Sequence, residues 1–130
     1  MRFIIYTLCA LVIMFLVWAI GLPKSLGAHP WWADKVIFIG APVGIVIAFG
    51  AMLIRGGMWL RLCVFAILTV LAYWVAKSGG EAFAASYADD AAAGKQWYFG
   101  WIATMTGLAA FLTTLAEVAA SKIAKKKADL

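Results

Sequence analysis

The sequence predicts an all-α membrane protein, a single bundle of four transmembrane helices over residues 1–130. Hydrophobic residues make up 66% of the chain and charged residues only 13%. In soluble domains about a quarter of all residues are charged. The apolar residues fall into four runs, each near the ~20 residues that a helix needs to cross a hydrocarbon core about 30 Å thick. Seven of the eleven basic residues lie in three short stretches that flank these runs. Together these features exclude a soluble fold.

The four predicted spans cover residues 3–22, 36–54, 58–76 and 97–120. An arginine before an apolar run also opens secretory signal peptides, but the first run is longer than the roughly 7 to 15 apolar residues of such a segment. We therefore expect 3–22 to remain as the first span.

Tryptophans mark the predicted boundary between the first two spans. Trp18 lies near the end of the first span, and Trp31 and Trp32 directly precede the second. Tryptophan is enriched at the headgroup level of membranes, so these residues predict an aromatic belt that anchors the protein in the lipid. Pro23 and Pro30 interrupt the connection between the two spans.

The second span carries a stripe of small residues. Gly40, Gly44 and Ala48 recur every four residues and so share one helix face. In lipid, helices associate where small residues let backbones approach closely, so this face is expected to pack against another helix of the chain. Pro42 removes a backbone donor within the stripe and permits a kink. A homo-oligomer interface, or a hinge at Pro42, is the alternative interpretation.

The fourth span repeats this pattern on two neighbouring faces, with Gly100 and Thr104 on one and Ala103 and Gly107 on the other. Threonine hydroxyls in a helix donate to the carbonyl one turn earlier, so their polarity does not require a solute pathway. We expect this of Thr104, Thr106, Thr113 and Thr114. The alternative hypothesis is that these threonines line a polar path for a small solute.

Two charged residues lie just inside the predicted spans. Arg61 starts the third span and Glu117 lies near the end of the fourth, at matching depth. A charge in a membrane is costly unless it is paired or reaches the interface. The two residues are therefore predicted to form an ion pair that joins the spans.

Residues 81–93, between the third and fourth spans, predict a short amphipathic helix outside the membrane. Ser78 and Glu81 have capping-box spacing, and Gly94 is placed to end a helix. This helix would rest on the bilayer or dock a partner through an outer face, which consists of Phe83, Tyr87, Asp89 and Asp90.

Basic residues set the expected orientation. One set of loops carries seven of them and the other carries the four lysines Lys24, Lys35, Lys77 and Lys95. The positive-inside rule then predicts that both termini are cytoplasmic, in a bacterial inner membrane. In the tail 121–130, the lysines are expected to bind anionic headgroups rather than nucleic acid, so the net charge of +5 reflects topology. The seven residues are Arg2, Arg55, Arg61, Lys122, Lys125, Lys126 and Lys127.

Little in the sequence predicts chemistry. Cys9 and Cys63 form no C-x-x-C motif and are expected to pack as small apolar residues. His29 is the only histidine and lies in a loop, so the chain alone cannot ligate a haem through two histidines. Phosphate-loop, dinucleotide-binding, zinc-protease and serine-hydrolase motifs are absent. We therefore expect no catalytic, cofactor-binding or metal site.

Two functional hypotheses follow. The first is a non-catalytic accessory or scaffolding subunit of a larger bacterial inner-membrane complex of the respiratory, secretion or conjugation type. Its partners would be membrane lipids and other integral membrane subunits. The alternative is a self-assembling small channel, transporter or holin-like pore, which requires a homo-oligomer and a lining supplied by residues such as Thr104 and Thr113.

Overall fold

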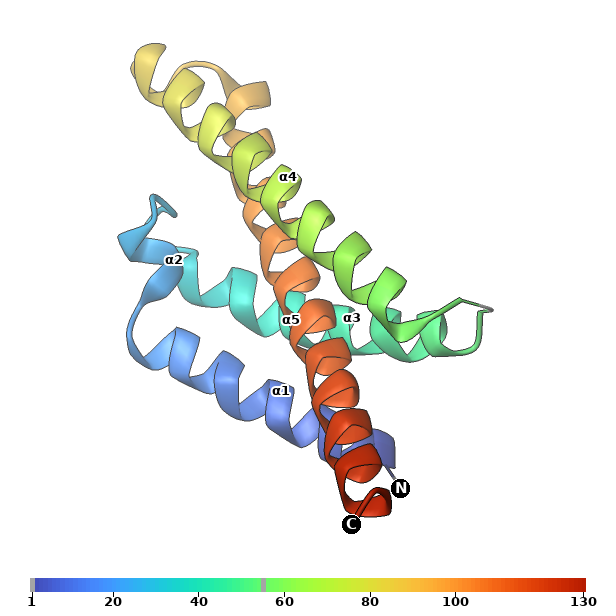
Figure 1. The fold of residues 1–130 in the computed structure, drawn as a ribbon. Helices are drawn as coiled ribbons and strands as arrows, with labels where there is room; N and C mark the ends of the chain where they lie inside the picture. Colours follow the sequence, from blue (N-terminus) through green and yellow to red (C-terminus); the bar gives the residue numbers. More distant parts are fainter. Residues whose placement is uncertain (1, 55) are drawn as a thin grey trace.

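The computed structural model describes residues 2–54 and 56–130 and consists of helices (Figure 1). Four are long, and α2 (Leu22–Ser25) is a single turn. The described ranges contain no strand. All four long helices are long and apolar enough to cross a membrane, which confirms the predicted all-α architecture with four candidate spans. They are α1 (Arg2–Ala19), α3 (Ala33–Met52), α4 (Met58–Ala85) and α5 (Ala91–Ala128).

Helix α5 is the centre of the molecule. It packs along α4, is crossed by α3 and also contacts α1, while α1 and α3 contact each other (Figure 1). Both chain termini lie at one end, and the turn between α4 and α5 lies at the other (Figure 1). We call these the Glu117 end and the Trp97 end, after a residue found at each.

Helix α1 shows why the outer helices need lipid. It buries a single stripe at helical spacing and leaves its remaining large side chains exposed. Such a surface is stable only where the surroundings are as apolar as the side chains. The stripe consists of Tyr6, Ala10, Met14 and Val17.

The small-residue stripe of α3 packs directly against α5. A Cβ added at Gly40 would lie 2.6 Å from the Cβ of Met105, and one at Gly44 would strike the carbonyl oxygen of Thr106. Ala48, one turn further, is fully buried. The stripe predicted from the sequence is therefore the face through which α3 contacts α5. Pro42 lies on an exposed side of α3, which is continuous from Ala33 to Met52, and its role as a hinge stays a prediction.

Helix α4 approaches α5 equally closely. A Cβ at Gly100 would lie 2.7 Å from the Cα of Ala76, and one at Gly79 would lie 2.6 Å from the backbone nitrogen of Trp97. These contacts run along the two helices and join them into one antiparallel pair.

The predicted separate helix over 81–93 is wrong. Helix α4 continues to Ala85, and α5 already begins at Ala91, so Ser78, Glu81 and Gly94 lie inside helices rather than at their ends. At ~1.5 Å per residue, the 28 residues of α4 extend about 42 Å, which is longer than a hydrocarbon core about 30 Å thick.

A tight turn joins the two helices instead. Tyr87 and Ala88 adopt positive φ values of 55° and 66°. The Ala88 amide donates to the Phe83 carbonyl oxygen at 3.0 Å, and the Tyr87 amide donates to that of Ala84 at 3.1 Å, which closes α4 with a Schellman motif. Asp90 then caps α5, because its side chain accepts from the Ala93 amide.

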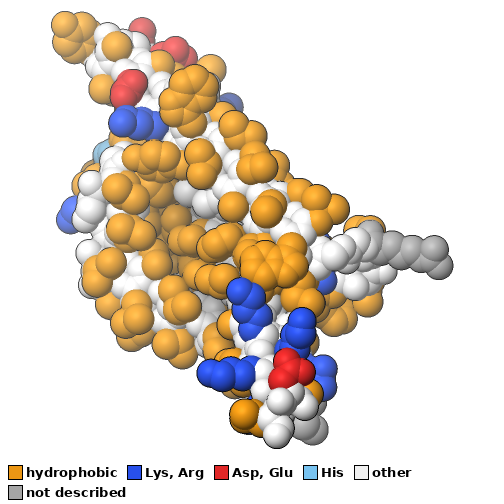
Figure 2. Space-filling model, in the orientation of Figure 1, with side chains coloured by type: hydrophobic (Ala, Val, Ile, Leu, Met, Phe, Trp, Pro, Cys, Tyr) orange, Lys and Arg blue, Asp and Glu red, His pale blue; other side chains and the backbone are white. Residues whose placement is uncertain are grey.

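The lysine-rich tail is helical, and the predicted boundary of the fourth span at residue 120 is not a structural boundary. Helix α5 runs on to Ala128, with Lys125, Lys126 and Lys127 in its last turn. Cations in that position are favoured by the helix dipole. Basic side chains gather at this end with acidic ones among them, acidic and basic side chains lie toward the opposite tip, and apolar surface covers much of the region between (Figure 2).

Candidate functional site

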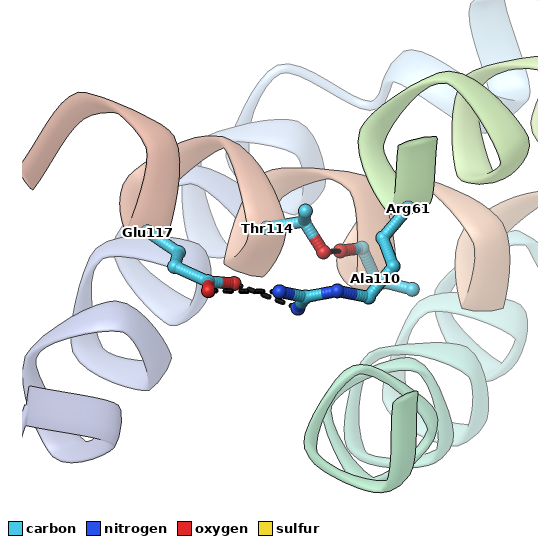
Figure 3. Close-up of polar contacts among 4 residues, drawn as sticks. All are labelled: Arg61, Ala110, Thr114 and Glu117. Atoms are coloured by element: carbon cyan, nitrogen blue, oxygen red, sulfur yellow. Dashed lines mark hydrogen bonds and ion pairs between the residues drawn. The ribbon is translucent and has the colours of Figure 1, made fainter. Parts of the chain in front are cut away.

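Arg61 and Glu117 meet at the Glu117 end of the molecule (Figure 3). The guanidinium Nη1 donates to Oε2 of Glu117 at 2.9 Å, and Nη2 donates to Oε1 at 3.0 Å. Arg61 lies in the first turn of α4 and Glu117 in the last third of α5, so the pair joins the two helices at the end opposite their connecting turn. The structure thus brings together the two side chains that the sequence analysis paired by depth.

Burial makes this pair more than a surface contact. The two side chains are 15% and 18% exposed. A bidentate guanidinium–carboxylate pair is among the strongest and most directional of protein hydrogen-bonded contacts. Removing one partner from such an environment leaves an uncompensated charge, which costs far more than loss of an exposed pair. The pair is therefore a structural staple between α4 and α5.

Threonines beside the pair satisfy their own helix. The Thr114 hydroxyl donates to the Ala110 carbonyl oxygen at 2.9 Å (Figure 3). Thr104 and Thr113 bond in the same way, to carbonyls one turn earlier, at 2.7 and 2.8 Å. All three are buried, so the expectation of self-satisfied threonines is confirmed for them. For Thr106 it stays a prediction.

A cavity of about 360 Å³ adjoins the ion pair at the same end. It lies between the first turns of α1, the first turn of α4 and the last turns of α5. Arg2, Tyr6, Glu117 and Ser121 supply its polar lining, and we call it the Arg2 cavity. Sequence reasoning missed it because its residues come from three segments far apart along the chain.

A groove lies between α3 and α4, which diverge and share almost no contact within the part of the chain that the structure describes. Its volume is about 420 Å³. Small residues of α5 form its floor, whereas Ile47 of α3 and Leu71 of α4 belong to its walls. The floor consists of Ala103, Thr106, Gly107 and Ala110, and we call this the α3–α4 groove.

The predicted packing residues therefore divide into two groups. Gly100 and Gly107 approach α4 closely, as the sequence pattern suggested. Ala103 does not pack against another helix of the chain, because it is exposed in the α3–α4 groove. The sequence placed Ala103 and Gly107 on one face correctly, but the divergence of α3 from α4 leaves part of that face uncovered.

An aromatic cluster ties the α1–α3 connection to α5 at the Trp97 end. The ring of Trp97 lies 5.1 Å from that of Trp32 and 5.6 Å from that of His29, both in edge-on geometry. Trp97 Nε1 also donates to the Gly27 carbonyl oxygen at 3.0 Å. Phe83 completes the cluster at 5.7 Å from Trp97. Sequence reasoning missed the cluster, although Trp32 and Trp97 lie close to predicted span ends.

This cluster describes the surroundings of two residues in the α1–α3 connection. Trp32 is half-buried among protein rings, whereas Trp31 is 88% exposed and Trp18 38% exposed, and the predicted aromatic belt stays a prediction. His29 is also half-buried, and its Nδ1 accepts from the Trp31 amide at 3.1 Å. Aromatic packing around the histidine explains its place in the loop.

The predicted outer docking face is not one surface. Phe83 points inward to Trp97, while Tyr87 is 96% exposed in the turn. Asp89 is exposed, and Asp90 serves as the N-cap of α5. A helix would have aligned Phe83 with Tyr87, but α4 ends between them.

The remaining predicted residues lie on the surface. Lys122 places its Nζ 5.0 Å from the centre of the Trp59 ring, a cation–π contact, and Lys125 to Lys127 are exposed. Arg55 lies outside the described residues. Cys9 and Cys63 are free and exposed, so the expectation that they pack inside the protein is wrong. Within 2–54 and 56–130, no three His, Cys, Asp or Glu residues gather as a metal site would require.

Comparison with protein-family models, with curated protein sequences and with solved structures finds no match to this chain.

Proposed function

We propose that this chain is a non-catalytic scaffolding subunit of a larger complex in the bacterial inner membrane, and that it holds a transmembrane helix of another subunit in the α3–α4 groove. The observation that carries the proposal is the exposure of Ala103 on the floor of that groove, between two helices that diverge on either side of it. Gly107 and Ala110, further along the floor, are buried.

The physics of helix association in lipid supports this occupant. Apolar surface gains little by moving from lipid to protein, so helices associate through close van der Waals contact at small residues. The same chain uses small residues in this way at Gly44 and Gly100, where α5 meets α3 and α4. The floor offers the same kind of surface on α5 to a further helix, which would contact the walls at Ile47 and Leu71.

Symmetry favours a different chain over a second copy. A twofold dimer that placed groove against groove would leave a gap at its centre, because both surfaces are concave. A head-to-tail contact, in which α1 of one copy entered the groove of the next, would build rings or open chains rather than a defined pair. A helix from another subunit fills the groove without leaving a central gap and without building rings or open chains.

We also propose that both termini are cytoplasmic. The support is the basic character of the Glu117 end, where six described basic side chains stand against the two acids Glu117 and Asp129. The positive-inside rule associates such an end with the cytoplasm. The exposed tip at Tyr87 and Asp89 then faces away from the cytoplasm and offers a second contact for a partner.

The pore hypothesis has less support. Thr104 and Thr113 were the polar residues expected to line a pore between copies, and both are buried with their hydroxyls bonded within α5. Lining a pore would require them to leave these contacts.

Purification in a gentle detergent, followed by mass spectrometry, tests the proposal. The tagged chain is expected to bring down at least one other integral membrane protein. Ala103→Leu fills the floor of the groove and is expected to reduce recovery of that protein at least about tenfold, a loss typical of a central interface residue. Ala119→Leu, an equal enlargement at an exposed site of α5 that does not line the groove, should leave recovery unchanged.

The pore hypothesis predicts a different result in the same experiment. A defined homo-oligomer without other subunits, together with solute flux through the purified protein in vesicles, would contradict the scaffolding role.

A further inference from the structure

The Arg2 cavity combines charges and hydroxyls in a way that the ion pair does not explain. Both carboxylate oxygens of Glu117 accept from Arg61, so the negative charge that lines the cavity is already compensated. Arg2 also lines it and has no carboxylate partner among the described residues. The lining therefore includes one exposed basic residue whose charge no described carboxylate compensates.

Two residues with hydroxyl groups line the same cavity as Arg2. Tyr6, which is 9% exposed, and Ser121 contribute to the lining. Neither hydroxyl has a hydrogen-bond partner in the part of the chain that the structure describes. A guanidinium next to free hydroxyl donors is the donor set that recognises a phosphate group.

The position of the cavity selects the source of that phosphate. It lies at the Glu117 end, and its lining combines charged and apolar residues. Ile5 and Met58 form part of the lining, so a molecule bound there meets apolar side chains as well as polar ones. A phospholipid matches this arrangement, since its phosphate sits at the headgroup level and its acyl chains extend along the apolar surface.

We propose that the Arg2 cavity binds the phosphate of an anionic phospholipid. The choice of an anionic lipid over a zwitterionic one follows from the charge of this end. A choline or ethanolamine group would bring a further cation close to Arg2 and Lys125, which lies one helical turn beyond Ser121. This site is independent of the partner helix in the α3–α4 groove, because the two cavities share no residue.

Lipid retention measured by native mass spectrometry tests the proposal. The purified full chain is exchanged into micelles with equal amounts of phosphatidylglycerol and phosphatidylcholine, and bound lipids are counted. One phosphatidylglycerol is expected to be retained in preference. Arg2→Gln is expected to lower its retention at least about fivefold, the value of one basic group near a membrane surface.

A matched charge variant separates binding at a site from diffuse attraction to the basic end. Lys127→Gln removes the same charge from the same end, but Lys127 does not line the cavity, so its effect should stay well below that of Arg2→Gln. Equal losses in the two variants would overturn the proposal.

A variant that keeps every charge provides a second arm. Ala124 is exposed and lines the cavity, so Ala124→Leu narrows it without disturbing a buried contact. Retention is expected to fall as it does in Arg2→Gln, whereas Ala119→Leu, outside the cavity, should behave as wild type. Unchanged retention in Ala124→Leu would overturn the proposal. So would displacement of the lipid by millimolar inorganic phosphate, which would identify the ligand as a free anion.

Discussion

Glu117→Ala is expected to lower the free energy of unfolding by about 3 kcal/mol. This value is near the lower limit for breaking a buried ion pair, since both side chains are partly exposed. The variant leaves the Arg61 guanidinium without either of its acceptors. Reversible unfolding in mixed micelles, followed by helical circular dichroism while a denaturing detergent is added, measures the loss. Arg61→Ala should cost a similar amount.

Exchange of the two residues tests whether the loss arises from the pair itself. The double variant Arg61→Glu with Glu117→Arg is expected to recover at least half of the lost stability, because the opposite charges still meet at this depth. Glu81→Ala, which removes an exposed glutamate of α4 without an ion pair in the described residues, should change stability by less than about 0.5 kcal/mol. No recovery in the exchanged protein would count against the staple.

Gly44→Ala is expected to cost at least about 3 kcal/mol, at the upper limit of ordinary overpacking. The added methyl group would strike the Thr106 carbonyl oxygen and lie 3.0 Å from the Ala110 backbone nitrogen. Backbone atoms in the middle of a helix cannot rotate away as side chains do, so α3 would have to move off α5. The same unfolding measurement detects the effect.

Gly50→Ala is the matched control on the same helix. A Cβ at Gly50 meets nothing within 4 Å. Because alanine favours helix more than glycine does, this variant should be neutral or up to about 1 kcal/mol more stable. If Gly44→Ala unfolded like Gly50→Ala, the close contact of α3 with α5 would not be the one described.

Local patterns in the sequence predicted the features that depend on lipid. The number and positions of the four candidate spans follow from apolar runs, because a helix must satisfy its own backbone in a bilayer. The packing role of Gly40 and Gly44 could be predicted for a related reason, since small residues on one face of a helix in lipid favour close packing against another helix. The meeting of Arg61 with Glu117 could be anticipated from depth alone.

Helix boundaries outside the membrane could not be predicted in this way. Ser78 and Glu81 have the spacing of a capping box, but their helix was already continuous from Met58, and no new start was needed. The turn is formed by Tyr87 and Ala88 at positive φ, and neither residue type signals that conformation. A sequence can show a good start for a helix without showing whether the preceding helix has ended.

Tertiary geometry accounts for the remaining differences. The divergence of α3 from α4, which opens the groove at Ala103, depends on how each helix crosses α5. The cluster of His29, Trp32 and Trp97 depends on a loop that folds back onto a helix about seventy residues later in the chain. Neither arrangement produces a periodic pattern in the sequence from which it could have been predicted.

Photocrosslinking from the floor of the α3–α4 groove tests the scaffolding role most directly. A benzophenone amino acid is placed at position 103 in the full chain in its native membrane, and at Val12, an exposed site on α1 outside the groove, as the control. We predict that position 103 captures one other integral membrane protein at a defined mass and that position 12 does not. Capture of lipid alone, or of a second copy of this chain, would contradict the account.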